Sequence, residues 1–391
     1  MPKVGFVAYG NDWVWLGGRY YLQHIIRSLE TVRRSADIEV SDVWWLQGPH
    51  EDPFSEVRSI IGEPTVVRLP KSLAGRFSRK ARRALTGEST AVDLFRNAGI
   101  DVCFPRPLCE NSGVPYIFWL PDFQHVRRPD LLSPEKVDWY RRYFDLHVEA
   151  AAQIVLSSDD AKRDFEKAYP GAVNRAHVVS FCSVPDDSWW SADPVEVRMK
   201  YGVPSKFFML CNQLTRHKNH EVIVEALRVL GQSGHRDIHV VCTGSFFDHR
   251  GEEYVSEIRK LLEKFQLQGR FHLLGLIPRS DQIALLRQSV CLLQPSLFEG
   301  WSTIVEDAKT LGKSVIASDL PVHYEQTTAL VQRHWLVDPT DALTWANAML
   351  ECWSLNSFGV DEMAEARGRR HLEFAMTKCG NAFVGAIQAV F

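Results

Sequence analysis

The chain has 391 residues, of which 45% are hydrophobic and 24% charged, and its formal net charge is −3. This length exceeds what one hydrophobic core usually fills, so we expect two domains. The composition is that of a globular protein, and the slightly acidic balance argues against a general nucleic-acid binder.

The cysteines and the hydropathy pattern bear on the compartment. The eight cysteines include no Cys-x-x-Cys pair, and several lie in apolar runs. They predict buried thiols in a reducing compartment, not a disulfide or zinc framework. The sequence opens without a signal-peptide pattern, and no apolar run approaches the length of a membrane span. We therefore expect a cytoplasmic protein.

The first half of the chain alternates apolar runs with helical patterns. A strand over 3–9 is followed by Gly17 and Gly18, and then by an amphipathic helix from about Arg19 to Leu29. Glycine lets a backbone approach an anion closely, so this arrangement indicates either a phosphate cradle or a plain turn. Further strands are predicted over 40–45, 65–69, 101–104, 116–120, 154–157 and 177–181, and helices over 54–61, 133–152 and from 158 onward.

Residues 71–86 are rich in basic side chains. On a helix, Arg76, Arg79, Lys80 and Arg83 would form one stripe. Such a stripe suits the headgroups of an anionic membrane surface or a phosphorylated acceptor, and it is equally typical of a solvated helix face.

The strand over 116–120 ends in a polar segment that includes His125. In open α/β sheets, ligands bind beyond the carboxyl ends of the strands. At this position His125 could donate to a sugar hydroxyl or to a phosphate, although a single histidine is more often structural.

Residues 182–194 carry two prolines and no periodicity, which predicts an interdomain linker. The βα alternation then restarts with a strand over 207–211. Residues 212–220 follow it and are rich in basic side chains, which at a strand end and helix start favour a diphosphate. Later strands are predicted over 239–243 and 271–274, with helices to 230, over 280–288, 341–353 and 361–391, and His323 in a surface loop.

The stretch 291–321 is the most informative part of the sequence. It indicates a strand over 290–293, a loop, a helix over 303–311 ended by Gly312, and a strand over 315–317. The loop holds Glu299, and Ser302 or Thr303 could cap the helix, whose free N–H groups can hold a phosphate. A carboxylate beside an anion site suits a ligand that carries both hydroxyls and phosphate.

This stretch resembles the signature of family 4 glycosyltransferases, in which seven residues separate two glutamates. Glu299-Gly300-Trp301 matches its start, and Ala308, Gly312 and Val315-Ile316-Ala317-Ser318 match its end. This register places the second acid on Asp307, where the family usually has Glu, whereas Glu306 matches by residue type. Both assignments stay open at this point.

The resemblance implies an α/β protein of the GT-B fold, with two Rossmann-like domains that face a cleft. We expect residues 1–185, with a C-terminal helix at about 374–391 crossing back, to form the acceptor-binding domain. Residues 195–373 are expected to form the nucleotide-sugar-binding domain.

The implied enzyme is a retaining, metal-independent hexosyltransferase without a cofactor. It would move a hexose from GDP-mannose or a UDP-sugar to a glycan or lipid-linked acceptor in bacterial surface polysaccharide synthesis. If the basic stripe in residues 71–86 binds an anionic membrane surface, the enzyme would be a peripheral protein at the inner face of the membrane. The alternatives are a sugar-nucleotide epimerase or hydrolase of the same architecture, and a non-catalytic nucleotide-sugar binder.

The resemblance also implies roles for individual residues. Lys218 matches a basic family residue that stabilises the departing diphosphate, while Gln213 stands where the family usually has Arg, a position for which Arg216 could substitute. Glu299 would hold the sugar and Asp307 the ribose. The expected catalytic residues are Glu299, His125 and Lys218. The expected nucleotide-sugar-binding residues are Gly17, Gly18, Gln213, Arg216, Lys218, Ile277, Glu299, Gly300, Trp301, Ser302, Thr303 and Asp307, with no metal site.

Overall fold

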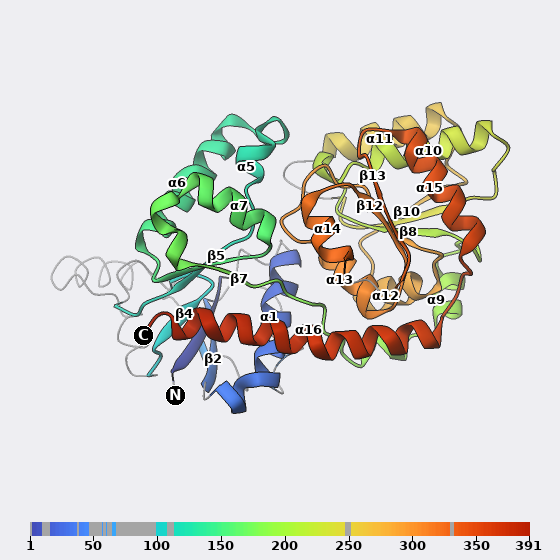
Figure 1. The fold of residues 1–391 in the computed structure, drawn as a ribbon. Coiled ribbons are helices and arrows are strands. Elements are labelled where there is room, and N and C mark those ends of the chain that lie inside the picture. The colour runs from blue at the N-terminus through green and yellow to red at the C-terminus, as the bar shows by residue number, and fades with distance from the viewer. Residues whose placement is uncertain are drawn as a thin grey trace, which may run out of the picture. The chain divides into compact units, whose positions relative to one another are not determined.

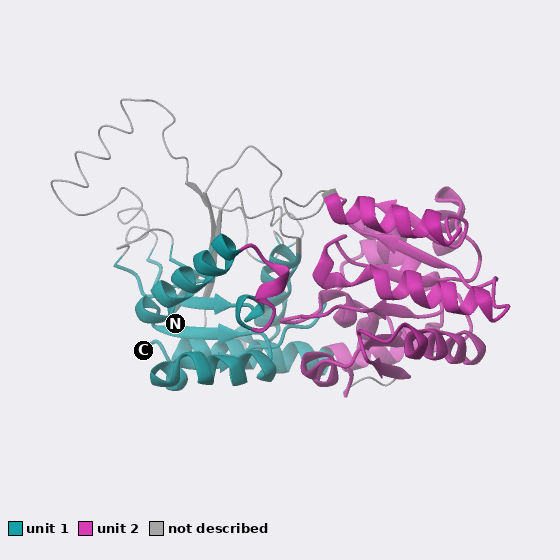
Figure 2. Cartoon of the chain, turned by 90° about the horizontal axis from the view of Figure 1, so that it is seen from above, with its two compact units in different colours: residues 1–126, 134–184, 373–391 teal, residues 127–133, 185–372 magenta. Residues whose placement is uncertain are grey.

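The computed structural model describes residues 2–9, 16–36, 39–46, 57, 60, 65–67, 99–107, 113–246, 252–328 and 332–391. They divide into two units, each with its own parallel sheet (Figures 1 and 2). Unit 1 comprises residues 1–126, 134–184 and 373–391, and unit 2 comprises residues 127–133 and 185–372. The predicted basic stretch over 71–86 lies outside the described residues, as does the helix over 54–61 apart from residues 57 and 60.

Unit 1 is built on parallel strands in the orders β3-β2-β1-β4 and β5-β6-β7. A parallel bridge between Cys103 and Tyr116 joins the two sets. The strands are β1 (Lys3–Tyr9), β2 (Glu39–Leu46), β3 (Thr65–Val67), β4 (Val102–Phe104), β5 (Ile117–Leu120), β6 (Gln153–Leu156) and β7 (Ala176–Val178). The helical segments between them along the chain are α1 (Leu16–Ala36), α5 (Gln124–Arg127), η3 (Pro129–Leu131), α6 (Pro134–Ala150), α7 (Asp159–Ala168) and η4 (Pro170–Arg175), of which η3 belongs to unit 2. Parallel strands with helical crossovers confirm the predicted βα alternation.

Unit 2 is built on one six-stranded parallel sheet in the order β10-β9-β8-β11-β12-β13. Its strands are β8 (Phe208–Cys211), β9 (Val240–Thr243), β10 (Phe271–Gly275), β11 (Leu292–Gln294), β12 (Val315–Ser318) and β13 (His334–Val337). Its helical segments are α8 (Ser188–Ser191), α9 (Pro194–Lys200), η5 (Arg216–Lys218), α10 (His220–Gln232), α11 (Glu252–Lys264), α12 (Arg279–Gln288), α13 (Thr303–Thr310), α14 (Pro321–Thr327), α15 (Ala342–Leu355) and the start of α16 (Glu362–Gln388). The order reverses between β8 and β11, which is the kind of place where open α/β sheets bind ligands.

The segment predicted as a linker contributes to the core of unit 2. Trp189 of α8 is 3% exposed and packs among Val197, Ile283 and Leu286. Pro185 is the first residue of this part of unit 2, and Pro194 is the first residue of α9. Asp193 caps α9 by accepting from the backbone N–H groups of Val195 and Glu196. The boundary between the two units, at Val184 and Pro185, thus falls inside the predicted interdomain linker 182–194, but the residues from Ser188 onward belong to the folded part of unit 2.

The C-terminal helix α16 confirms the expected crossing to the first unit. Phe383 lies with its ring 4.7 Å from that of Phe104, both in unit 1. A Cβ on Gly380 would meet the carbonyl oxygen of Ser28 in α1 at 2.5 Å, so glycine lets the two helices approach closely. Phe374, where the expected C-terminal helix was to begin, is 68% exposed, whereas Phe383 is fully buried.

Candidate functional site

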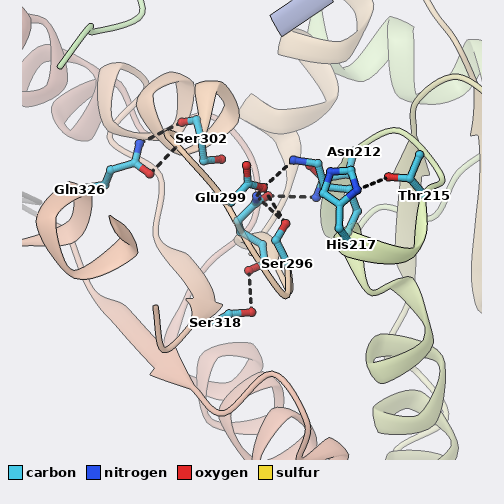
Figure 3. A network of polar contacts seen from close by, with 10 residues as sticks. Asn212, Thr215, His217, Ser296, Glu299, Ser302, Ser318 and Gln326 are labelled. Carbon is cyan, nitrogen blue, oxygen red and sulfur yellow. Dashed lines mark hydrogen bonds and ion pairs between the residues drawn. The ribbon is translucent and has the colours of Figure 1, made fainter. Parts of the chain in front are cut away.

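The polar side chains of unit 2 gather where its parallel strands end. Two loops meet there: residues 212–219 follow β8, and residues 295–302 follow β11. Leu297 N donates to the carbonyl oxygen of His217, and Asn219 Nδ2 donates to the carbonyl oxygen of Pro295. These bonds fix one loop against the other, so their side chains form one cluster (Figure 3).

Glu299 is the centre of this cluster. Its Oε1 accepts from Lys218 Nζ at 2.5 Å, from Gln294 Nε2 at 2.7 Å and from Ser296 Oγ at 2.7 Å. Asn212 extends the network by donating to Gln294 Oε1 at 3.0 Å. The side chain of Glu299 is 8% exposed and that of Lys218 is 18% exposed. The two predicted catalytic groups of unit 2 are therefore brought together, and Lys218 is the more exposed of the two.

Helix α13 begins directly after this loop. Ser302 is its N-cap residue, but no side-chain capping bond forms. Gln326 of α14 supplies the contacts instead, accepting from Ser302 N at 3.2 Å and donating to Ser302 O at 3.0 Å (Figure 3). Ser302 therefore does not cap the helix through its own side chain, as was expected for Ser302 or Thr303. The side chain of Gln326 holds the Ser302 backbone instead, and no local sequence pattern indicated this contact. At the other end, Gly312 has φ +62°, which confirms the predicted glycine stop.

The two acids in α13 have different partners. Glu306 is 2% exposed and accepts from Gln326 Nε2 at 2.8 Å and from Lys309 Nζ at 3.1 Å. Burial raises the pKa of Glu306 above its usual value, against the opposing effect of Lys309. Asp307 is 0% exposed, and its Oδ2 accepts from Arg279 Nη2 at 2.6 Å. Both carboxylates are therefore held by buried hydrogen bonds: Glu306 by Gln326 and Lys309, and Asp307 by Arg279.

The remaining predicted residues of unit 2 surround the two loops. Arg216 is 51% exposed and pairs with Glu257 at 2.6 Å, so a diphosphate would have to compete with that acid. Gly300, Trp301 and Thr303 are partly buried in the loop and the first turn of α13. Gln213 and Ile277 are also partly buried, the first after β8 and the second after β10.

In unit 1, the structure changes the setting of the glycine pair. Helix α1 starts at Leu16, so Gly17 and Gly18 lie in its first turn and not in a loop before it. The first N–H groups of a helix lack partners within the helix, so glycines there keep a backbone that can face an anion. The predicted helix start at about Arg19 was three residues late.

His125 is buried within an aromatic group of unit 1. It is 5% exposed, and its ring lies 5.1 Å from that of Phe144 and 5.9 Å from that of Tyr140. Burial lowers the pKa of His125 below its usual value, and the charge of Arg141 adds to this effect. The imidazole is therefore neutral at pH 7.

His323 was predicted on a surface loop, and the structure contradicts this. It lies in α14, is 0% exposed, and its Nδ1 is 2.8 Å from the carbonyl oxygen of Ser318. A carbonyl only accepts, so Nδ1 carries the proton. The segment lacks a clear period, because Pro321 begins a helix of only seven residues.

None of the described helices has a stretch long and apolar enough to span a bilayer. The seven cysteines among the described residues are all free thiols.

Comparisons with known proteins agree with this geometry. Residues 198–369 match the family model described as glycosyl transferases group 1. A search of curated proteins found no significant match. Among solved structures, the chain is similar to the Anabaena protein HepE in complex with UDP and glucose, with a TM-score of 0.66 and 16% identity over 99% of this chain and 100% of that one.

Two further structures show the same architecture. A glycosyltransferase from Rickettsia africae matches with a TM-score of 0.64 and 15% identity, covering 99% of this chain and 95% of that one. WaaG, a glycosyltransferase involved in lipopolysaccharide biosynthesis, matches with a TM-score of 0.58 and 16% identity, covering 97% of this chain and 98% of that one. At these identities the structural matches establish the fold, and the family match covers the segment that holds Lys218, Glu299 and Asp307. Residues 198–369 therefore match the family of group 1 glycosyl transferases, and the chain as a whole shares the fold of these solved structures.

Proposed function

We propose that the protein is a retaining hexosyltransferase that uses a nucleotide-diphosphate sugar as donor and a glycan or lipid-linked molecule as acceptor. The observation that carries this proposal is the Lys218–Glu299 pair at 2.5 Å, at the carboxyl ends of β8 and β11. It joins a cation and a sugar-binding carboxylate on adjacent strands, which suits a ligand with a phosphate next to a hexose.

The proposed roles follow from the charges. When the bond between the sugar and the diphosphate breaks, negative charge develops on the leaving phosphate oxygen. Lys218 stabilises that charge, together with the N-terminus of α13. Because Gln326 already occupies the Ser302 N–H, the following N–H groups of the helix, from Thr303 onward, face the phosphate. Glu299 accepts from a hydroxyl of the hexose, with Gln294 and Ser296 holding its carboxylate in place.

Unit 1 supplies the acceptor side in this proposal, with the first turn of α1 at Gly17 and Gly18 and with His125. A neutral imidazole can accept from or donate to a sugar hydroxyl. The nucleoside half of the donor is assigned to the side of unit 2 that carries Ile277 and Asp307. A pathway in bacterial surface polysaccharide synthesis is proposed from the resemblance and from the printed role of WaaG.

Donor binding is tested by thermal unfolding with UDP, GDP and their sugars. UDP and UDP-glucose come first, because the Anabaena protein was solved with each of them. A ligand at 100 times its Kd stabilises the folded protein by about 2.7 kcal/mol. Lys218→Met should lose most of this stabilisation.

The control is Lys206→Met, because Lys206 also bonds within unit 2 but precedes β8, at the other end of the strand. We expect it to keep the ligand response. No response of the wild-type protein to any nucleoside diphosphate or nucleotide sugar would refute the proposal. Binding followed by acceptor-independent conversion would favour an epimerase or hydrolase, and binding without turnover would favour a non-catalytic binder.

A further inference from the structure

Arg279 is a charged residue of unit 2 that the sequence analysis did not assign. It is the first residue of α12 and follows Ile277-Pro278, beyond the end of β10. Its Nη2 donates to Asp307 Oδ2 at 2.6 Å, and its Nη1 donates to Gln282 Oε1 at 2.7 Å. Its guanidinium carbon also lies 5.3 Å from the centre of the Trp189 ring. Two acceptors and an aromatic face therefore hold the guanidinium in one orientation.

Gln282 connects this arrangement to the sheet. Its Nε2 donates to Thr243 Oγ1 at 3.0 Å, at the end of β9. A guanidinium fixed through such a chain loses little conformational freedom when it binds a ligand, which favours affinity. The geometry is that of a prepared binding group and not of a mobile surface arginine.

Exposure separates the two members of the ion pair. The side chain of Arg279 is 19% exposed, whereas that of Asp307 is 0% exposed. The second carboxylate oxygen, Asp307 Oδ1, is buried as well and has no hydrogen-bond partner. At this place a ligand therefore meets the guanidinium first, and the carboxylate lies behind it.

Residue length gives a reason for this arrangement. Aspartate is shorter than glutamate by one methylene, about 1.5 Å of reach. In the signature that the sequence resembles, the second acid is usually Glu, and here it is Asp307. The shorter acid lies inside the unit, and Arg279 occupies the space in front of it.

The sheet order indicates which half of the donor would reach Arg279. Lys218 and Glu299 follow the adjacent strands β8 and β11, whereas Arg279 follows β10, two strands from β8. At about 4.8 Å per strand, β10 lies roughly 10 Å from β8. A nucleotide sugar whose hexose and phosphates bind at β8 and β11 would reach β10 with its ribose and base if these lie on the side of unit 2 that carries Ile277 and Asp307, as the proposed function assigns them.

We propose that Arg279 binds the nucleoside half of the donor through a hydrogen-bond acceptor of the ribose or the base, and that Asp307 is a positioning residue acting through Arg279. This inference rests on the proposed function. It differs from a direct contact between Asp307 and the ribose, because only one residue of the pair touches the ligand.

The experiment is a double-mutant cycle on the affinity for the nucleoside diphosphate that wild type binds, measured by titration calorimetry. Arg279→Gln should weaken binding by about tenfold or more, as expected for a hydrogen bond from a charged donor. Asp307→Asn should weaken it less. In the Arg279→Gln background, Asp307→Asn should cause no further loss, since its effect passes through Arg279.

Inorganic pyrophosphate is the second probe, and all these variants should bind it as wild type does. The 2′-deoxy and 3′-deoxy forms of the nucleoside diphosphate separate the two acceptors: if Arg279 meets a ribose hydroxyl, wild type loses on one of these ligands about as much as Arg279→Gln loses on the ribonucleotide. If it meets the base, wild type keeps most of its affinity for both deoxy ligands, and Arg279→Gln weakens the ribonucleotide and both deoxy ligands equally.

Arg279→Gln leaves Asp307 as a buried carboxylate without its cation and could unfold unit 2. The double variant removes both charges, so comparing it with Asp307→Asn measures the effect of Arg279 in any case. Additive losses in the cycle, unchanged nucleotide affinity without Arg279, or an equal loss of pyrophosphate affinity would each overturn the inference. A wild-type protein that binds no nucleotide would instead refute the proposed function.

Discussion

The Lys218–Glu299 pair leads to a prediction in which two substitutions act in opposite directions. Without a donor, Lys218 is bonded to Glu299 at 2.5 Å, so a diphosphate must draw the lysine away from that carboxylate. Lys218→Met removes the cation. We expect it to weaken binding of a nucleoside diphosphate by about 10- to 100-fold, the equivalent of roughly 1.5–3 kcal/mol for a charge-assisted hydrogen bond.

Glu299→Gln removes the competitor instead. The amide oxygen keeps the shape and can still accept from Gln294 and Ser296, which lie at 2.7 Å from the present carboxylate oxygen. Without that carboxylate the Lys218 ammonium no longer has to leave a partner, so diphosphate affinity should be unchanged or rise by up to about fivefold, the equivalent of about 1 kcal/mol. Turnover should fall by about 10²-fold or more, because the carboxylate that holds the hexose in the transition state is lost.

The assay is calorimetric titration of wild type and both variants with the nucleoside diphosphate and with the plain nucleoside. Lys206→Met serves as the control. Since Lys218→Met leaves Glu299 without its cation, its unfolding temperature must first be shown to exceed the assay temperature. The reasoning is refuted if Glu299→Gln weakens the diphosphate as much as Lys218→Met does, or if Lys218→Met weakens nucleoside and diphosphate equally.

Three further predictions concern other described residues. Gln326→Leu removes both hydrogen bonds to the Ser302 backbone and should raise the donor KM about tenfold. The control is Gln288→Leu, because Gln288 is also buried but bonds to the carbonyl oxygen of Ser205; it should leave the KM unchanged. Equal effects of the two substitutions in steady-state kinetics would contradict this. Burial lowers the pKa of His220 from 6.5 to about 3, because the folded protein holds this imidazole neutral. The free energy of unfolding is therefore highest above pH 6.5, and by pH 5 it should fall by about 2 kcal/mol as the unfolded chain takes up a proton. In urea unfolding, the free energy of His220→Gln should depend less on acid than that of wild type, and an equal dependence would exclude His220 as a cause. His125→Gln should lower turnover about tenfold with unchanged donor affinity, and normal turnover in a folded variant would remove it from the mechanism.

Local patterns were sufficient to predict the framework of the site. The apolar runs and the glycine at 312 predicted β11, α13 and β12 to within two residues, because burial and the glycine stop are encoded locally. The helix predicted from residue 158 onward was also encoded locally, because Ser158 caps α7 by accepting from Ala161 N at 3.0 Å.

Long-range contacts were beyond the reach of the sequence. Arg279 and Asp307 are 28 positions apart, and Gln326 and Ser302 are 24 apart, so their pairing depends on how helix ends pack. Trp189 was misassigned for a related reason: its neighbouring prolines indicate a break, while its burial depends on α9 and α12. A local pattern shows which residues could act, and packing determines which of them face a ligand.

The most direct test of the account is a transfer assay with wild type and Glu299→Gln. UDP- and GDP-sugars are each incubated with and without a glycan or lipid-linked acceptor, and the released nucleoside diphosphate and the glycosylated acceptor are measured together. The account predicts that one donor releases nucleoside diphosphate in step with glycosylated acceptor, only when acceptor is present, and at least about 10²-fold more slowly in Glu299→Gln. Release at the same rate without acceptor, or normal transfer by Glu299→Gln, would contradict it.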